Sequence, residues 1–445
     1  MTALKESTET NPPSESRSPK SDGRRVFGNF LSLSIVQFAN YLAPLITLPY
    51  LFQVLGPSKY GLTELARAVS VYFLMLTDYG FSLSATREIS VHRDDPRRVS
   101  ELFSCVMLLK FLLLVLSAAL LSLIVLAVPK LRVDWPVYFL SFGNVVGMWL
   151  FPIWLFQGLE WMKYIPLLNV TAKTLVVICV FVFIRSPADY LYVPLFQSGG
   201  TILIGLAGLI LAFGTFRLRF HLSSLATLKR EFANGWHIFL SKMAVTLYTT
   251  SNVVILGLVT DSSFVAYYTA GDKIVRAVVD GLQVPLSQAI FPHIGRLASQ
   301  SKQAALRFTA KIAKLAGVVT LAMSAGLFAA APWLAGFVMR EKASEGLPVI
   351  RILSLLPFIV GLSNIFGVQI MVNFGLKRLL TRILAAAGVL NVLLALLLAV
   401  RFQHVGVATA SLITEIVVTI ALFVALRRNG LDVFGRTARA EPSDA

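Results

Sequence analysis

Long apolar segments recur along this chain from Phe27 to Leu426, and no other feature limits its fold as strongly. A helix of about 20 predominantly apolar residues crosses the roughly 30 Å of hydrocarbon in a bilayer. Backbone N–H and C=O groups in lipid must be hydrogen-bonded within the protein, so segments of this length are predicted to be helical. The sequence therefore predicts an all-α integral membrane protein with about twelve transmembrane helices.

Composition agrees with this class. Apolar residues make up 56% of the 445 positions and charged residues 14%, whereas a soluble chain of this size needs more polar residues to cover its exterior. The predicted spans cover residues 27–52, 60–84, 103–128, 135–157, 165–184, 191–213, 236–259, 264–290, 315–338, 348–372, 381–400 and 406–426.

Basic residues are distributed unevenly between the connections of these spans. The chain has 40 Lys and Arg residues and a net charge of +17, which in a soluble protein would suggest nucleic acid binding. Here one set of alternate connections, together with both tails, holds most of them. The other set holds only Lys59, Lys130, Arg132, Arg185, Arg340, Lys342 and Arg401. Because cytoplasmic loops carry the basic excess, both termini are predicted to be cytoplasmic, and no nucleic acid partner is expected.

The longest internal connection divides the chain into two halves. We expect a disordered cytoplasmic tail over residues 1–26, an N-terminal six-helix lobe over 27–213, a basic cytoplasmic linker over 214–235, a C-terminal six-helix lobe over 236–426 and a second tail over 427–445. A weak repeat, which aligns Tyr60–Val69 with Ala266–Val275, supports two pseudo-symmetric lobes. Transporters built in this way place the substrate path between their halves, so a central lumen is predicted.

Basic side chains inside the predicted spans are the main candidates for a binding site. A charge at the centre of a membrane helix costs about 2.5–3.5 kcal/mol on insertion scales and usually faces a cavity or a partner. We assign four of them to the lumen as substrate-binding cations, namely Arg67, Lys242, Lys273 and Arg276. Lys273 needs no ion pair on its own helix and is predicted to be a free cation. Lys110 and Arg351 lie near span ends, and we expect them and Lys173 to extend toward the membrane interface.

Two of these cations have a structural alternative. Arg67 lies one turn from Glu64, and an ion pair between them would lower the cost of burial without any lumen. Arg276 lies four residues from both Asp272 and Asp280, so a self-neutralising ladder is the alternative for this residue.

Polar side chains on the same helices are predicted to line the lumen. Pro44 and Pro49 are expected to bend or break the first span beside the cavity, although a merely kinked structural helix is the alternative. Hydroxyl groups that follow one another in span 236–259 either face the lumen or hydrogen-bond between helices. The predicted lining residues are Asn40, Tyr41, Thr63, Thr246, Thr249 and Asn252. The carboxylates that are candidates for binding a coupling ion are Glu64, Asp78, Asp280 and Glu415.

The excess of basic over acidic residues in the spans favours an anionic substrate. Diphosphate suits Arg because its planar donor fork matches phosphate oxygens. The chain has no GxxxxGK[ST] motif, so an ion gradient rather than nucleotide hydrolysis is expected to drive transport. The five His residues are dispersed and the only two Cys residues, Cys105 and Cys179, lie in apolar segments. No catalytic group, metal site or cofactor is therefore predicted, apart from a coupling H+ or Na+.

Several motifs spread over residues 27–426 give the chain a specific resemblance. They are Asn40–Tyr50, Val54–Pro57, Tyr60–Gly61, Thr77–Ile89, Phe151–Glu160, Ala270–Val275, Phe291–Pro292 and Ser363–Gln369. With these motifs the sequence resembles the polysaccharide-exporting flippases, which translocate O-antigen or capsule repeat units linked to undecaprenyl diphosphate. That family belongs to the multidrug/oligosaccharidyl-lipid/polysaccharide exporter superfamily.

The resemblance implies two lobes of six helices around a cationic lumen that opens alternately to either side, with H+ or Na+ antiport. The substrate would pass from the cytoplasmic to the periplasmic leaflet of the bacterial inner membrane, for O-antigen, capsule or exopolysaccharide. Lipid-linked oligosaccharide and membrane lipids would be its partners, together with polysaccharide polymerase and assembly proteins. Two alternatives stay open. A drug or organic-cation exporter on the same fold would prefer buried carboxylates, and a membrane-bound polysaccharide polymerase or ligase would need a longer outer loop.

Overall fold

The computed structural model describes residues 19–162, 164–216, 218–221 and 224–431, and the side chains of residues 19–42 fall outside that description. The first half of the chain forms α1 (Pro19–Asp78), α2 (Phe81–Val91), α3 (Pro96–Ala127), α4 (Pro129–Val133), α5 (Trp135–Leu150), α6 (Ile153–Gly158), α7 (Tyr164–Phe183), η1 (Pro187–Leu191) and α8 (Tyr192–Phe216). The second half forms α9 (Leu225–Val259), α10 (Ser262–Gln300), α11 (Lys302–Met339), η2 (Arg340–Lys342), α12 (Ala343–Leu353), α13 (Leu356–Asn364), η3 (Ile365–Met371) and α14 (Lys377–Arg428). No strand occurs within these described ranges.

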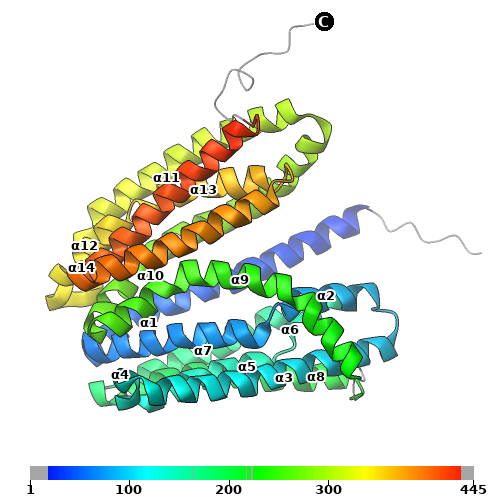
Figure 1. Cartoon of the computed structure of the whole chain (residues 1–445), viewed down its shortest axis with the longest axis horizontal. Coiled ribbons are helices and arrows are strands. Elements are labelled where there is room, and N and C mark those ends of the chain that lie inside the picture. The colour runs from blue at the N-terminus through cyan, green and yellow to red at the C-terminus, as the bar shows by residue number, and fades with distance from the viewer. Residues whose placement is uncertain (1–18, 163, 217, 222–223, 432–445) are drawn as a thin grey trace, which may run out of the picture.

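These helices form two lobes (Figure 1). Helices α1 to α8 make the lower lobe in that view, and α10 to α14 make the upper one. Helix α9 contacts both, because it packs against α14 as well as against α1, α2 and α3. The lobes meet near α4 and α12 and diverge toward the opposite end, where α1 begins and α14 ends (Figure 1). The predicted all-α fold of two lobes is thereby confirmed, and the two described ends of the chain lie on the same side.

Two of the longest helices contain a turn that divides them. Helix α1 has 60 residues and is interrupted at Gly56, whose φ of 70° favours glycine. Helix α14 has 52 residues and is interrupted at Gln403, with a φ of 49°. The chain turns back at both places (Figure 1). Each of these helices therefore covers two of the predicted spans, 27–52 with 60–84 and 381–400 with 406–426.

Six segments of the described chain are long and apolar enough to cross a membrane by length and composition, or seven if a bent pair within α10 counts as one. Two of the six have 70 and 52 residues, which is more than the roughly 20 residues that one crossing needs. The predicted total of about twelve crossings is consistent with this finding and stays a prediction.

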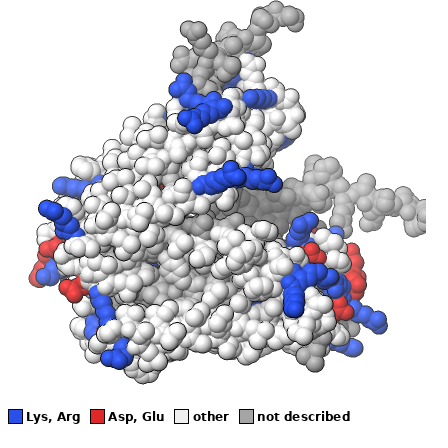
Figure 2. Space-filling view, in the orientation of Figure 1, with Lys and Arg blue, Asp and Glu red and all other residues white. Residues whose placement is uncertain are grey.

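Charged side chains gather toward the ends of the molecule on the face shown in Figure 2, and a broad uncharged surface lies between them. Helix α3 contributes to the apolar exterior with the exposed residues Leu112, Val115, Leu116 and Leu123. An apolar exterior of this extent is typical of a protein whose surface contacts lipid.

The two lobes approach each other closely at Gly61 of α1. A Cβ atom at this position would lie 1.8 Å from the carbonyl oxygen of Ser262 and 2.9 Å from the backbone nitrogen of Ala266, both in α10. Only glycine fits such a backbone contact. The contact places the following turn of α1, with Glu64, directly against α10.

The tails and the linker have helical parts that the sequence did not suggest. Helix α1 begins at Pro19, so residues 19–26 of the expected disordered tail are helical, whereas residues 1–18 lie outside the described chain. Helix α9 begins at Leu225, after the first eleven residues of the expected basic linker. Ser224 caps it by accepting a hydrogen bond from the Thr227 N–H at 3.2 Å. The predicted lobe boundaries themselves stay predictions.

Candidate functional site

Two buried carboxylates, Glu64 and Asp78, lie in the second part of α1. Fourteen residues separate them in sequence, which corresponds to about 21 Å along a helix. Each forms an ion pair with one cation of the N-terminal lobe and with one lysine from the second half of the chain. These two clusters are the centres of two cavities, which we call the Glu64 cavity and the Asp78 cavity.

In the first cluster Glu64 is held by two cations. Arg67 Nη2 lies 2.8 Å from its Oε2, and Lys273 Nζ of α10 lies 2.6 Å from its Oε1. The Lys273 ammonium also donates to the Tyr60 hydroxyl at 3.0 Å. The side chain of Glu64 is only 5% exposed, so the carboxylate has exchanged water for these donors. One carboxylate shared by two cations leaves a positive charge in excess.

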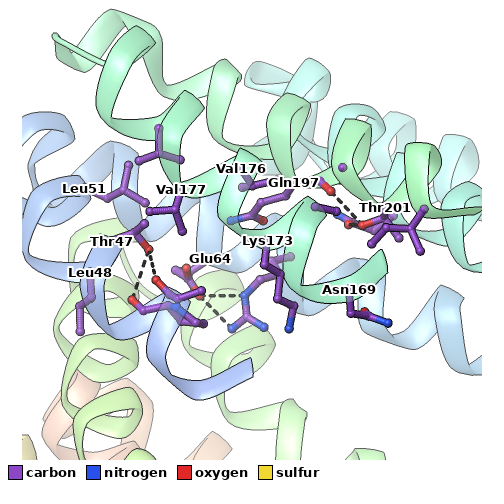
Figure 3. A pocket seen from close by; sticks show the side chains of 18 of the residues that line it. Thr47, Leu48, Leu51, Glu64, Asn169, Lys173, Val176, Val177, Gln197 and Thr201 are labelled. Atoms are coloured by element: carbon purple, nitrogen blue, oxygen red, sulfur yellow. Dashed lines mark hydrogen bonds and ion pairs between the residues drawn. The ribbon is translucent and has the colours of Figure 1, made fainter. Parts of the chain in front are cut away.

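The Glu64 cavity has a volume of about 440 Å³ and lies within the N-terminal lobe, between α1, α5, α7 and α8, with Lys273 reaching in from α10. Figure 3 shows Glu64, Lys173, Asn169, Gln197 and Thr201 around this space. Its basic residues are Arg67, Lys173 and Lys273. Three basic side chains and one carboxylate give the wall an excess of about two positive charges.

The walls of the Glu64 cavity differ in polarity. One part carries amide and hydroxyl groups, in which Thr201 donates to the Asn144 side-chain oxygen at 2.8 Å and Gln197 lies one turn away (Figure 3). Another part is apolar and is made by Leu48, Leu51, Val176, Val177 and Val180. The cavity therefore offers cations, hydrogen-bonding groups and apolar surface together.

In the second cluster Asp78 lies between two lysines. Lys242 Nζ of α9 is 2.6 Å from its Oδ2, and Lys110 Nζ of α3 is 3.6 Å from its Oδ1. The Ser82 hydroxyl of α2 also donates to Asp78. The surrounding cavity has a volume of about 740 Å³, and its wall also includes Gln157 and Thr246.

Aromatic packing brings α9 to Asp78. The Tyr79 ring stacks on the rings of Phe232 and Phe239, with centroids 4.3 and 4.8 Å away. At the turn between α1 and α2, Gly80 has a φ of 88° and lies so close to α9 that a Cβ atom would be 2.8 Å from the Ile238 side chain. These contacts hold the first half of α9 against the N-terminal lobe and so place Lys242 beside Asp78.

The structure corrects two predictions about single cations. Lys273 is not free, because it is bonded to Glu64 across the lobes at 2.6 Å. Lys110 does not extend toward the interface, since it is 4% exposed and faces Asp78. Lys173 lies on the wall of the Glu64 cavity. Arg351 is exposed and lies over the Phe328 ring at 5.5 Å, as expected for a side chain that reaches outward.

The two alternatives for Arg67 turn out to be compatible, because this residue pairs with Glu64 and also lines a cavity. Arg276 forms one of the two ion pairs of its structural alternative, with Nε 2.9 Å from Asp272 Oδ1, and lines neither cavity. Of the bend or break predicted at Pro44 and Pro49, the break is absent and the bend stays a prediction. Helix α1 continues through Pro44 and Pro49, and its one non-helical residue is Gly56.

The predicted lining residues are distributed differently from expectation. Thr246 lines the Asp78 cavity. Thr63 and Asn252 line neither of the two cavities. Both are buried between helices, where Thr63 donates to the Tyr60 carbonyl oxygen at 2.7 Å and Asn252 donates to the Tyr268 hydroxyl at 3.1 Å. Thr249 is exposed on α9. The side chains of Asn40 and Tyr41 lie outside the described part of the chain.

The candidate coupling carboxylates divide into two groups. Glu64 and Asp78 line the two cavities, whereas Asp280 and Glu415 line neither. Among the described residues, no group of three or more His, Cys, Asp or Glu side chains could hold a metal ion. Cys105 is buried and Cys179 is partly buried.

Sequence reasoning missed several polar residues of the Glu64 cavity, namely Asn144, Asn169, Gln197 and Thr201. Each is a polar side chain within a predicted apolar span, and that placement was the available indication. Periodicity within one span shows which residues share a face, but it does not show which face meets a cavity.

Comparisons with known proteins place this fold among transporters. A family model described as "Polysaccharide biosynthesis protein" matches residues 26–298. A "Putative O-antigen transporter" of Escherichia coli (strain K12) is 31% identical over 403 residues, covering 91% of this chain and 97% of that protein. A protein of the same description from Shigella dysenteriae is 28% identical, covering 90% and 99%.

Two solved structures share the fold at low sequence identity. An inward-facing multidrug resistance MATE family transporter of the MOP superfamily superposes with a TM-score of 0.64 at 12% identity, covering 91% of this chain and 99% of that one. The lipid II flippase MurJ, in an inward closed conformation, has a TM-score of 0.59 at 14% identity, covering 88% and 87%. At these identities the likeness concerns the fold alone.

Proposed function

The chain belongs to the family of polysaccharide biosynthesis proteins, and from this premise we propose that it flips oligosaccharide repeat units linked to undecaprenyl diphosphate from the cytoplasmic to the periplasmic leaflet of the bacterial inner membrane. It is a multi-pass membrane transporter and not an enzyme. Its relatives are described as putative O-antigen transporters, and the proposed product serves O-antigen, capsule or exopolysaccharide.

The observation that carries this proposal is the combination of groups on the wall of the Glu64 cavity. The diphosphate of a lipid-linked glycan bears about two negative charges, which match the excess of about two positive charges on that wall. Arg67 supplies a planar donor fork, and Lys173 and Lys273 supply point charges. Asn144, Asn169 and Gln197 offer amides to sugar hydroxyls. A drug or organic-cation exporter would need the opposite excess.

The physical task also fits two lobes that part on one side. A sugar head group is too polar to cross hydrocarbon, whereas its isoprenoid tail can remain in lipid throughout transfer. The lobes diverge at the end where the described chain begins and ends (Figure 1), and the basic excess of the sequence assigns that end to the cytoplasm. We therefore propose that this arrangement is the state that receives substrate from the inside.

Coupling to an ion gradient is part of the proposal. Glu64 and Asp78 each hold a lysine from the second half of the chain, so protonation of either carboxylate, or Na+ binding to it, would release that lysine. At Glu64, whose lysine comes from α10, this release would favour separation of the lobes. We propose H+ or Na+ antiport through these two groups, and polymerase and assembly proteins as the partners that receive the product.

Deletion of the gene and complementation with variants test the function. We expect the deletion strain to lose surface polysaccharide and to retain lipid-linked units on the cytoplasmic leaflet, while the wild-type gene restores export. Arg67→Ala should impair export in well-expressed protein, and Arg67→Lys should impair it less because the charge remains. Normal surface polysaccharide in a deletion strain that has no second flippase would refute the proposal.

A further inference from the structure

Beyond the ion coupling proposed for Asp78, the cavity around it has the features of an anion site. It is formed by six helices, α1, α2, α3, α5, α6 and α9. Its volume of about 740 Å³ lies in the range of cavities that enclose small organic ligands. Met148 of α5 lines both this cavity and the Glu64 cavity, so the two spaces are neighbours.

The surroundings of Lys110 are the clearest indication that this cavity binds a ligand. Its side chain is 5% exposed, and its Nζ lies 3.6 Å from Asp78 Oδ1, beyond the ordinary hydrogen-bond distance. An ammonium group has three donors, and a buried charge is costly unless it is paired and hydrogen-bonded. Asp78 meanwhile makes its shorter contact, at 2.6 Å, with Lys242. Lys110 is therefore paired only loosely.

The net charge of the Asp78 cluster also indicates an anion site. Two lysines and one aspartate leave an excess of about one positive charge in a wall that is otherwise uncharged. Ser82, Gln157 and Thr246 add hydrogen-bonding groups next to the lysines. An anion with several oxygen acceptors would satisfy Lys110 and balance this charge.

We propose that the Asp78 cavity is a second binding site for the diphosphate group, which the substrate occupies before it reaches the Glu64 cavity. This inference rests on the proposed function and adds a site to it. The two carboxylates lie about 21 Å apart along α1, and Asp78 is the one nearer the end where the lobes diverge (Figure 1). Asp78 is paired with Lys242. An entering diphosphate oxygen would replace the Asp78 carboxylate between Lys242 and Lys110.

This exchange explains why a carboxylate is present in an anion site. Without Asp78, two buried ammonium groups would face each other without compensation. With it, the empty cavity is tolerable and the ligand displaces only one hydrogen-bonded ion pair. The Glu64 cluster has the same composition, one carboxylate with two cations, so the substrate would meet the same chemistry at both positions.

A labelling experiment separates the two sites. In full-length protein with Cys105 and Cys179 replaced by Ala, Thr246→Cys reports on the Asp78 cavity and Thr201→Cys on the Glu64 cavity. The protein is placed in phosphatidylcholine nanodiscs, and farnesyl diphosphate is the probe. We expect the probe to slow labelling by N-ethylmaleimide at both positions.

Single substitutions should then act on one reporter each. Lys110→Met should raise the probe concentration needed for protection at position 246 about tenfold and leave position 201 unchanged. Lys242→Met is a second variant with the same expectation, and both keep one lysine for Asp78, which favours folding. Asp78→Asn should lower the required concentration because the competing anion is gone. Lys377→Met, an exposed lysine at the start of α14, is the matched control and should change neither reporter.

Three outcomes would overturn the inference. The first is no protection at position 246, and the second is protection there that persists in both lysine variants. The third is loss of the difference between wild type and Lys110→Met when phosphatidylglycerol is added to the nanodiscs, since the occupant would then be a membrane phospholipid. If export is normal in complementation while any of these results holds, only the second site fails. If the deletion strain exports normally, the proposed function fails as well.

Discussion

The two lobes differ in the surroundings of their polar groups. The N-terminal lobe surrounds cavities of about 440 and 740 Å³ whose walls carry charge. In the C-terminal lobe the cavity beside Gln283 and Gln369 has only about 20 Å³ and an uncharged wall. There Asn252, Tyr268 and Asn391 also satisfy one another, since the Asn391 amide donates to the Asn252 side-chain oxygen at 2.9 Å.

This difference shows how two halves of similar topology divide one task. The N-terminal lobe provides the space and most of the binding groups, whereas the second half of the chain provides a tightly packed body and two lysines, Lys242 and Lys273, that reach into that space. Lys242 lies on the half of α9 that is held against the N-terminal lobe, so movement of one lobe against the other would chiefly withdraw Lys273 and change the charge of the Glu64 cavity.

The largest effect that would test this division is expected for Glu64→Ala. The substitution leaves Lys273 and Arg67, whose side chains are 23% and 43% exposed, without their shared carboxylate. Removing one partner of a buried ion pair costs about 3–5 kcal/mol, and the partial exposure of the two cations places the cost toward the lower end. We expect a large loss of thermal stability in detergent together with loss of export. Glu64→Gln, which keeps the shape and one acceptor, should lose less. A variant with wild-type stability and export would show that the pair does not link the lobes.

A smaller loss is expected where the lobes touch without charge. Gly61→Ala places a Cβ atom 1.8 Å from the Ser262 carbonyl oxygen, so α1 and α10 must move apart, at a cost of about 3 kcal/mol for an overpacked contact. Thermal unfolding and export measure the result. Gly317→Ala in α11 is the matched control because nothing lies within 4 Å of its added Cβ, and there we expect unchanged or slightly higher stability. Equal behaviour of the two variants would contradict the close contact.

The features that could be predicted from the sequence are those that depend on local properties of the chain. Apolar length and the distribution of basic residues set the helices and the common side of the two ends, and even the interruption at Gly56 falls between two predicted spans. The partners of Lys273 and Lys110 lie 209 and 32 positions away in sequence. No periodicity within one helix reports such pairs, so a free cation and an outward-reaching lysine were reasonable but wrong expectations.

The C-terminal lobe should respond to loss of a polar group in stability alone. Asn252→Ala removes one hydrogen bond from the Tyr268 hydroxyl and one from the Asn391 amide, and the loss of such buried hydrogen bonds costs on the order of 1–2 kcal/mol. We expect a lower melting temperature but normal export per folded molecule. Thr249→Ala, an exposed position on the same helix, should change neither. A selective loss of export in Asn252→Ala would mean that the C-terminal lobe also contacts substrate.

The smallest effect concerns an ion pair that has the same chemistry as the Glu64 cluster but lies in water. Arg93 Nη1 is 3.2 Å from Glu160 Oε1, and the two side chains are 52% and 75% exposed. Exposed pairs contribute at most about 1 kcal/mol because solvent screens them and the side chains lose freedom. We expect Arg93→Ala to change the free energy of unfolding by less than about 0.5 kcal/mol and to leave export intact.

A double-mutant cycle with Glu160→Ala should give a coupling energy that falls further at high salt, since ions screen exposed charges. The Glu64–Lys273 pair should keep its coupling under the same conditions, because its carboxylate is only 5% exposed. If both cycles gave the same coupling and the same salt dependence, burial would not be what distinguishes the charges of the two cavities from those of the surface.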